Sequence, residues 1–178
     1  MTADQRRPGP RDRKRFERIV LEYDERLRGL AFRLLDDRDL MDDVLQDVYV
    51  KAFVALDGFR RQASIGTWLY RITYTTCIDC LRRQRRLTVL PDEILAVWPD
   101  PGADPSDRVA ERDRVAVALR TLSPEQRATI LLVDRDGFDY RAAAEVLDVP
   151  MGTVASRIST ARAALRRILD PSEEREEP

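Results

Sequence analysis

The chain has 178 residues, of which 43% are hydrophobic and 35% charged, and its formal net charge is −1. No apolar run is long enough to cross a bilayer, and no apolar segment follows the basic N-terminus, so we expect a cytoplasmic protein without a membrane segment. Histidine is absent, which removes the commonest general base and the commonest zinc ligand. We therefore expect neither an enzyme nor a protein that holds a metal or another cofactor.

The N-terminal part of the chain predicts a short tail followed by helices. Residues 1–15 are basic and contain a Pro-Gly-Pro run, so we expect them to be disordered. Hydrophobic residues then recur with a helical period over 16–35. A second helical pattern covers 39–56, with Asp39 as its expected N-cap.

The second predicted helix carries a polar face. Asp43, Gln46 and Asp47 are spaced i, i+3, i+4, so their side chains share one side of the helix. Such a face is either a solvated acidic surface or a docking surface for a basic partner, and the helix alone does not decide between them.

A loop with an aromatic residue and two arginines, FRRQASIGT at 59–67, precedes a third predicted helix over 67–83. One face of this helix carries Arg71, Tyr74, Thr75, Ile78 and Arg82, and its tyrosine, threonine and arginine side chains are expected to be exposed. Stacking aromatics beside guanidinium groups are typical of single-stranded DNA binding. The arginine cluster that closes the helix is also favoured by the helix dipole, so part of it needs no ligand.

Cys77 and Cys80 form a C-x-x-C motif within this helix. Thioredoxin-like motifs follow a strand, which the sequence does not predict here, and zinc would need two more ligands. Since Cys80 falls within the apolar stripe and Cys77 at its margin, we expect both to be structural.

Residues 87–108 are acidic and contain four prolines, which excludes a long helix. We interpret them as a flexible linker, either a mere spacer or a tether that threads a partner. The linker separates two predicted helical domains, 16–86 and 109–169, and an acidic tail follows over 170–178. The expected fold class is therefore all-α, with two small domains.

The second domain begins with a helix near residue 109, whose expected inward residues are Val115, Leu119 and Leu122. Ser123-Pro-Glu-Gln is a capping box with proline at the first helical position, which predicts a helix that runs to Asp136. Gly137 is expected to end that helix, and Asp139 to cap the next one.

The stretch 140–167 predicts a short helix, a turn at Pro150 and Gly152, and a longer helix. The apolar stripe of the longer helix comprises Val154, Ile158, Ala161, Leu165 and Ile168. Arginine, serine and threonine lie off this stripe, as a helix-turn-helix needs in order to read the major groove. A plain helical hairpin with a solvated basic face is the alternative.

Taken together, these motifs resemble the extracytoplasmic-function (group 4) sigma factors of the sigma-70 family over nearly the whole chain. DLMDDVLQDVYVKAF at 39–53 resembles region 2.2, and FRRQASIGTWLYRI at 59–72 resembles region 2.3 with its loop. CIDCLRRQRR at 77–86 resembles the end of region 2.4, and the segment 122–165 resembles region 4. Four matches in the family's order, with a linker between them, are highly specific.

The resemblance implies a set of partners and of contact residues. Asp43, Gln46 and Asp47 would bind the β′ clamp helices of core RNA polymerase. Residues for the promoter −10 element would be Phe59, Arg60, Arg61, Ser64, Trp68, Arg71, Tyr74, Thr75, Arg82 and Arg83. Residues for the −35 element would be Thr153, Ser156, Arg157, Thr160 and Arg162. The resemblance further implies promoter melting, a stress-responsive role and an anti-sigma factor that covers both domains.

The chain departs from the family pattern at three positions. Ala155 stands where the family often has lysine, Thr75 where many members have asparagine, and Cys80 where a larger residue is common. The promoter preference is therefore expected to differ at both elements.

Two rival interpretations belong to other classes of protein. A free-standing helix-turn-helix repressor would bind duplex DNA without polymerase, and it gives the face of Asp43, Gln46 and Asp47 no role. A thiol oxidoreductase would depend on Cys77 and Cys80, so their replacement by serine would abolish its activity.

Overall fold

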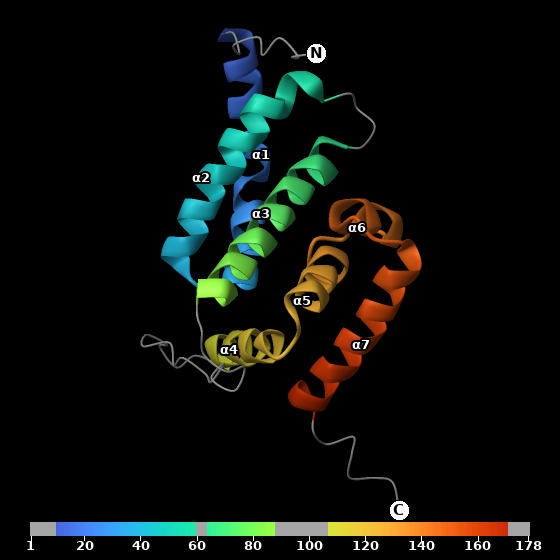
Figure 1. The fold of residues 1–178 in the computed structure, drawn as a ribbon. Coiled ribbons are helices and arrows are strands. Elements are labelled where there is room, and N and C mark those ends of the chain that lie inside the picture. Colours follow the sequence, from blue (N-terminus) through green and yellow to red (C-terminus); the bar gives the residue numbers. More distant parts are fainter. Residues whose placement is uncertain (1–9, 60–63, 88–106, 171–178) are drawn as a thin grey trace, which may run out of the picture.

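The computed structural model describes residues 10–59, 64–87 and 107–170 (Figure 1). Every regular element within these ranges is helical, which confirms the predicted all-α fold. Residues 1–9, 88–106 and 171–178 lie outside the described part of the chain, and so does the loop segment 60–63, which holds Arg60 and Arg61.

The N-terminal half is a bundle of three long helices. α1 (Pro10–Leu35) and α2 (Arg38–Ala55) run antiparallel, the 3₁₀ turn η1 (Leu56–Gly58) follows α2, and α3 (Ile65–Leu87) packs against both (Figure 1). Aliphatic side chains at helical spacing fill the space between these helices, among them Leu27, Leu30, Leu34, Val44, Leu45, Val48 and Leu69.

Three helix starts differ from the sequence expectation. α1 begins at Pro10, so the expected disorder over 10–15 is wrong. Asp37, and not Asp39, caps α2, because its carboxylate accepts the N–H of Leu40 at 2.9 Å. α3 begins at Ile65, and the Ser64 hydroxyl caps its first turn by accepting the N–H of Thr67 at 2.9 Å.

The C-terminal half contains α4 (Asp107–Arg120), α5 (Pro124–Ile130), the π-helical segment η2 (Leu131–Arg135), α6 (Tyr140–Leu147) and α7 (Met151–Leu169). The predicted capping box at Ser123 is confirmed, with both of its hydrogen bonds present. Asp139 caps α6 through the N–H of Ala142 at 2.7 Å, and Gly137 takes a φ of 74° after η2, as expected.

Two expected core residues of this half are exposed. Val115 and Ile168 each keep 39% of their surface, whereas Leu119 and Leu122 are buried as predicted. Within the described side chains of α4, residues 114–117 are exposed and residues 118–119 are buried. Ile168 lies in the last turn of α7, beyond the part of that helix that is packed.

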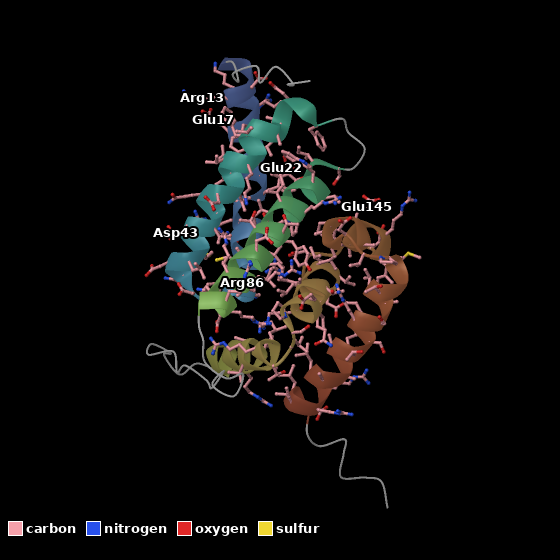
Figure 2. All side chains as sticks on the ribbon, viewed as in Figure 1. Arg13, Glu17, Glu22, Asp43, Arg86 and Glu145 are labelled. Atoms are coloured by element: carbon pink, nitrogen blue, oxygen red, sulfur yellow. The ribbon has the colours of Figure 1, made fainter. Side chains whose placement is uncertain are left out.

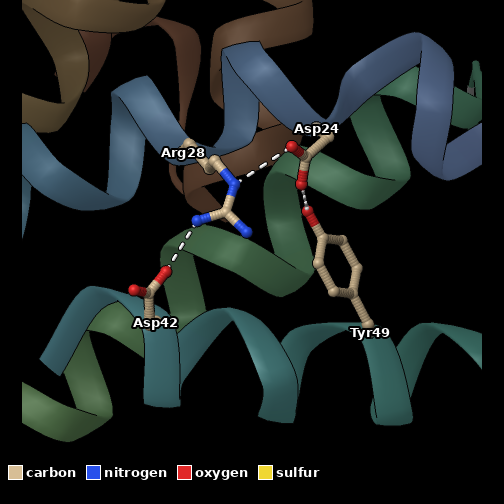
Figure 3. Close-up of polar contacts among 4 residues, drawn as sticks. All are labelled: Asp24, Arg28, Asp42 and Tyr49. Atoms are coloured by element: carbon tan, nitrogen blue, oxygen red, sulfur yellow. Dashed lines mark hydrogen bonds and ion pairs between the residues drawn. The ribbon is translucent and has the colours of Figure 1, made fainter. Parts of the chain in front are cut away.

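A polar network joins α1 to α2 (Figure 3). The Arg28 guanidinium on α1 donates to Asp24 at 3.0 Å and to Asp42 of α2 at 2.6 Å, while the Tyr49 hydroxyl donates to Asp24. Exposed pairs of this kind add little stability. They do hold one side of α2 against α1, which leaves the side with Asp43 facing outward.

The two halves, which the sequence predicts as two small domains joined by a flexible linker, pack directly against each other. α6 packs on α3, α5 reaches α1, and one continuous cluster of buried residues spans both halves. Between the halves, the Tyr70 ring of α3 lies 4.8 Å from the Phe138 ring, centroid to centroid. This contact between the halves determines which candidate site residues are accessible.

Candidate docking and nucleic-acid surfaces

The polar face predicted on α2 is exposed on the surface of the protein. Asp43, Gln46 and Asp47 are all exposed, and Figure 2 shows Asp43 on the outer side of α2, away from the other helices. Among the described residues, no ion pair involves either carboxylate. We call these three residues the docking face.

Two valines extend the docking face toward the end of α2. Val50 keeps 65% and Val54 61% of its surface, and they follow Asp43 and Asp47 at the spacing of successive helical turns. Sequence analysis missed them, although apolar residues that lie off the buried stripe were a readable signal. Exposed apolar residues rimmed by polar side chains are a feature of protein contact surfaces.

The candidate residues for single-stranded DNA on α3 are only partly accessible. Arg71, Thr75, Arg82 and Arg83 are exposed, and the Thr75 hydroxyl donates back to the Arg71 carbonyl at 2.9 Å. Tyr74, in contrast, is only 8% exposed, and Ile78 on the same face is buried. The expected exposure of Tyr74 is wrong because the C-terminal half covers this face of α3.

The loop before α3 places an aromatic pair at the edge of the bundle. The Phe59 and Trp68 rings lie 5.1 Å apart, and both residues are half-buried, whereas Ser64 is exposed. A shallow hollow beside them is also lined by Arg15 and Arg18 of α1. These two arginines add positive charge beside the aromatic pair, and sequence analysis had assigned Arg15 to the tail.

The helix-turn-helix consists of α6, a turn and α7. Asp148 ends α6 in the left-handed conformation with φ 56°, and Pro150 precedes α7. The buried stripe of α7 contains Val154, Ile158 and Ala161 as predicted. This stripe packs against α5 and α6, so the opposite side of α7 is not covered by these helices.

The five candidate residues on α7 do not share one surface. Ser156 and Thr160 are exposed, and Thr153 is half-buried. Arg157 and Arg162 lie on opposite flanks, since residues five apart in a helix are separated by about 140°. Arg162 forms two hydrogen bonds with Asp134 of η2, at 2.6 and 3.1 Å, within the C-terminal half.

Arg157 lies at the junction of the two halves, beside Tyr74. Its Nη1 atom is buried without a hydrogen-bond partner. Burial raises the pKa of the Tyr74 phenol, Glu125 adds to the rise, and the Arg157 guanidinium opposes it. The structure therefore brings one candidate from each set of DNA-binding residues together, with Tyr74 buried and Arg157 partly buried.

Cys77 and Cys80 are both buried and free. Burial raises the pKa of the Cys77 thiol to about 12 and also raises that of Cys80. Because the reactive form of cysteine is the thiolate, this environment disfavours the redox interpretation. Among the described residues, no group of three or more His, Cys, Asp and Glu side chains could hold a metal ion, and no helix is long and apolar enough to cross a membrane.

Comparison with known families decides between the interpretations. The family model of sigma-70 region 2 matches residues 19–87, and that of sigma-70 region 4 matches residues 112–165. The chain belongs to the sigma-70 family of RNA polymerase sigma factors. The N-terminal half described above is thus region 2, and the helix-turn-helix half is region 4.

Individual relatives place the chain in the extracytoplasmic-function (ECF) group. It is 35% identical over 158 residues to the ECF RNA polymerase sigma factor SigM of Mycobacterium tuberculosis, covering 89% of this chain and 79% of that protein. It is 33% identical over 171 residues to the ECF RNA polymerase sigma-E factor of Escherichia coli, covering 90% and 89%.

Two solved structures match the fold of both halves together. The sigma factor RpoE of Bartonella quintana, solved in complex with the anti-sigma factor NepR, superposes with a TM-score of 0.72 at 28% identity, over 89% of this chain and 99% of that one. CnrH, solved in complex with the cytosolic domain of CnrY, superposes with a TM-score of 0.66 at 29% identity, over 90% of each chain.

Proposed function

We propose that this sigma factor binds core RNA polymerase through the docking face and directs it to promoters through separate −10 and −35 contacts. The observation that carries the proposal is the exposed docking face, which a free-standing repressor would not need. It lies on α2, across the molecule from the helix-turn-helix (Figure 1). Polymerase can therefore hold the protein without covering the helix that reads duplex DNA.

The −35 element would be read by α7 in the major groove. Ser156 and Thr160 supply hydroxyl groups near its exposed N-terminal half, and Arg157 supplies a guanidinium once it is freed from the junction. Arg162 would first have to exchange its contact with Asp134 for a phosphate or a base. The exposed Met151 at the start of α7 can in addition touch a thymine methyl group.

The −10 strand would be held by the loop before α3 and by α3 itself. Phe59 and Trp68 offer faces for an unstacked base, while Arg71, Arg82 and Arg83 offer phosphate contacts. Each captured base contributes about 1–3 kcal/mol, which is the free energy available for promoter melting. Neither DNA contact needs to be strong alone, because attachment to polymerase makes the second one effectively intramolecular.

We also propose that an anti-sigma factor regulates this protein. The solved neighbour RpoE was captured with the anti-sigma factor NepR, and the present chain shares its fold over 89% of its length. The exposed docking face is a contact for which polymerase and an anti-sigma factor can compete.

Run-off transcription tests the proposed function directly. Core polymerase would be supplied with a library of genomic promoters, with and without this chain. We expect promoter-specific transcripts only when the chain is present, and their start sites give the −10 and −35 sequences together. Duplex binding without core polymerase, combined with no transcripts, would instead support a free-standing repressor.

A further inference from the structure

The shallow hollow at the edge of the N-terminal bundle is formed largely by α1. Arg15, Arg18, Ile19 and Glu22 of α1 line it, together with residues on either side of the loop before α3. Its volume is about 520 Å³, within the range of about 300–1,000 Å³ that is usual for small-molecule sites. We call it the edge hollow.

Aromatic contacts fix the part of α1 that borders the edge hollow. Phe16 packs against Tyr49 and Phe53 of α2, with ring centroids 6.5 and 5.2 Å apart. Tyr23, two turns later, lies so close to Gly66 of α3 that a Cβ atom at this glycine would be 2.9 Å from Cε1 of the tyrosine. Both ends of this stretch of α1 are held against the bundle, so the α1 side of the hollow has a fixed position.

The charged side chains that α1 contributes are separated along the hollow. Arg15, Arg18 and Glu22 are spaced i, i+3, i+7 and therefore share one face of α1. All three are exposed, and within the described ranges no ion pair involves any of them. Burial raises the pKa of the Tyr23 phenol and the Glu22 carboxylate adds to the rise, which places this carboxylate beside Tyr23 at the α3 end of the hollow.

The rest of the lining is apolar, apart from Ser64, whose hydroxyl is engaged in capping α3. Ile19 of α1 and Ile65 of α3 are half-buried, and so is Phe59. The Phe59 ring also lies 5.1 Å from the Trp68 ring. The edge hollow is therefore continuous with the aromatic pair, and a strand that stacks on this pair can continue into the hollow.

Two guanidinium groups, an apolar wall and one carboxylate match the chemistry of an unpaired nucleotide. Guanidinium groups pair with phosphates, while aromatic and aliphatic side chains contact the faces of bases. A carboxylate repels phosphate but accepts a hydrogen bond from an exocyclic amino group, which adenine, cytosine and guanine carry and thymine lacks. An acidic peptide would also satisfy the arginines, but its charge would be repelled by Glu22 and it would gain little from the aromatic pair.

We propose that the edge hollow binds one unpaired nucleotide of the DNA strand that contacts Phe59 and Trp68. Arg15 and Arg18 hold its phosphates, and Glu22 selects a base with an amino group. This inference rests on the proposed function, but its first test uses the free chain and needs no polymerase.

The first test measures binding of short single-stranded oligonucleotides of deoxycytidine or of thymidine to the free full-length chain, by fluorescence anisotropy. Arg15→Ala combined with Arg18→Ala should weaken binding of both about tenfold at physiological salt. The slope of log affinity against log salt should become shallower by about 1.4, because each lost phosphate contact of a single strand accounts for about 0.7.

Arg13→Ala combined with Lys14→Ala is the matched control. It removes the same number of positive charges from exposed positions in the same stretch of α1, outside the lining of the hollow. Because such charges act only through screened, longer-range attraction, the affinity should change by less than about twofold. Equal losses in the two double variants would overturn the hollow as a site, and so would failure of wild type to bind either oligonucleotide.

Glu22→Gln tests the selection of the base. An amide both donates and accepts, so it no longer disfavours thymine. The ratio of the affinity for deoxycytidine oligomers to that for thymidine oligomers should be about fivefold higher in wild type than in this variant. Glu17→Gln, exposed on α1 and outside the lining, should keep the wild-type ratio. An equal ratio in wild type and Glu22→Gln would overturn the selection.

An acidic partner gives a different outcome in the same assay. Binding of polyglutamate that depends on Arg15 and Arg18, without binding of either oligonucleotide, would overturn the nucleotide site and assign the hollow to an acidic protein segment.

The second test uses core polymerase and a promoter fragment that is already unpaired in and beyond the −10 element. Each unpaired base in turn is made cytosine or thymine, and the lifetime of the complex is measured for wild type and Glu22→Gln. At one position beside the −10 strand, thymine should shorten the lifetime about fivefold in wild type only. Absence of such a position would overturn the selection. Failure of wild type to form any complex would instead contradict the proposed function, and the oligonucleotide measurements on the free chain would still decide the site.

Discussion

The guanidinium Nη2 of Arg71 lies 3.0 Å from Oδ1 of Asp148, which joins the helix expected to hold the −10 strand to the turn of the helix-turn-helix. Asp148 has a φ of 56°, a conformation that aspartate and asparagine tolerate and β-branched residues avoid. A single side chain therefore serves both the local turn between α6 and α7 and the contact between the halves.

Asp148→Val should destabilise the protein by about 1–2 kcal/mol, because valine in the left-handed conformation is strained. Asp148→Asn keeps the backbone preference and should cost less than about 1 kcal/mol, which is the loss of one exposed ion pair. Urea unfolding followed by circular dichroism measures both. Equal stability of the two variants would mean that the turn does not depend on the conformation of this residue.

Gly66 and Gly152 provide a matched pair of helical glycines. A Cβ atom at Gly66 would lie 2.9 Å from Cε1 of Tyr23, whereas one at Gly152 would meet nothing within 4 Å. Gly66→Ala should therefore cost about 1–3 kcal/mol through overpacking. Gly152→Ala should add about 0.5–1 kcal/mol of stability, since alanine favours a helix. Thermal unfolding of both variants should show shifts of opposite sign.

Reversing charge on the docking face should weaken core binding. We expect Asp43→Lys combined with Asp47→Lys to reduce affinity for core polymerase at least about tenfold, because like charges would then face the basic partner. Asp57→Lys, at an exposed position just beyond α2, is the control. Fluorescence anisotropy of labelled chain against core measures both. Equal affinities would mean that polymerase binds elsewhere.

Arg157→Ala should reduce transcription from −35-dependent promoters about tenfold, as expected for the loss of one guanidinium contact. Core binding should be unchanged. Arg141→Ala, on the exposed surface of α6, is the matched control and should have little effect. If Arg157→Ala weakened core binding as much as transcription, the role of Arg157 would be structural.

Because the Cys77 thiol is buried, the free energy of unfolding should decrease at high pH. Its pKa is raised by burial from 9.0 to about 12, so the unfolded chain ionises at lower pH than the folded one. The contribution to stability is complete below pH 9 and is lost as the pH rises toward 12, by at most about 1.4 kcal/mol per pH unit.

Comparison of wild type with Cys77→Ala isolates this contribution, because the buried phenols of Tyr49 and Tyr70 have raised pKa values in both proteins. The difference in unfolding free energy between the two proteins should narrow between pH 9 and pH 11. A constant difference, or rapid alkylation of Cys77 at pH 8, would contradict the buried environment.

Features that depend on neighbours along the chain were predictable from the sequence. The capping box at Ser123, the cap at Asp139 and the stop at Gly137 involve residues only three or four positions away. The N-cap of α2 was predicted wrongly because several aspartates lie close together before this helix. The sequence pattern favoured Asp39, but Asp37 is the cap. The apolar stripe predicted for α7 is buried as far as Ala161, where α5 and α6 cover it.

The amino-acid pattern predicts the helices, the helix-turn-helix and the polar face on α2, because periodicity and capping act within one or two helical turns. The burial of Tyr74, the position of Arg157 against it and the ion pairs of Asp36 and Asp148 across the halves follow only from the packing of distant helices. These contacts join residues from opposite sides of the linker. Which helix faces meet there depends on the complementarity of two assembled surfaces, and no local pattern in the chain records it.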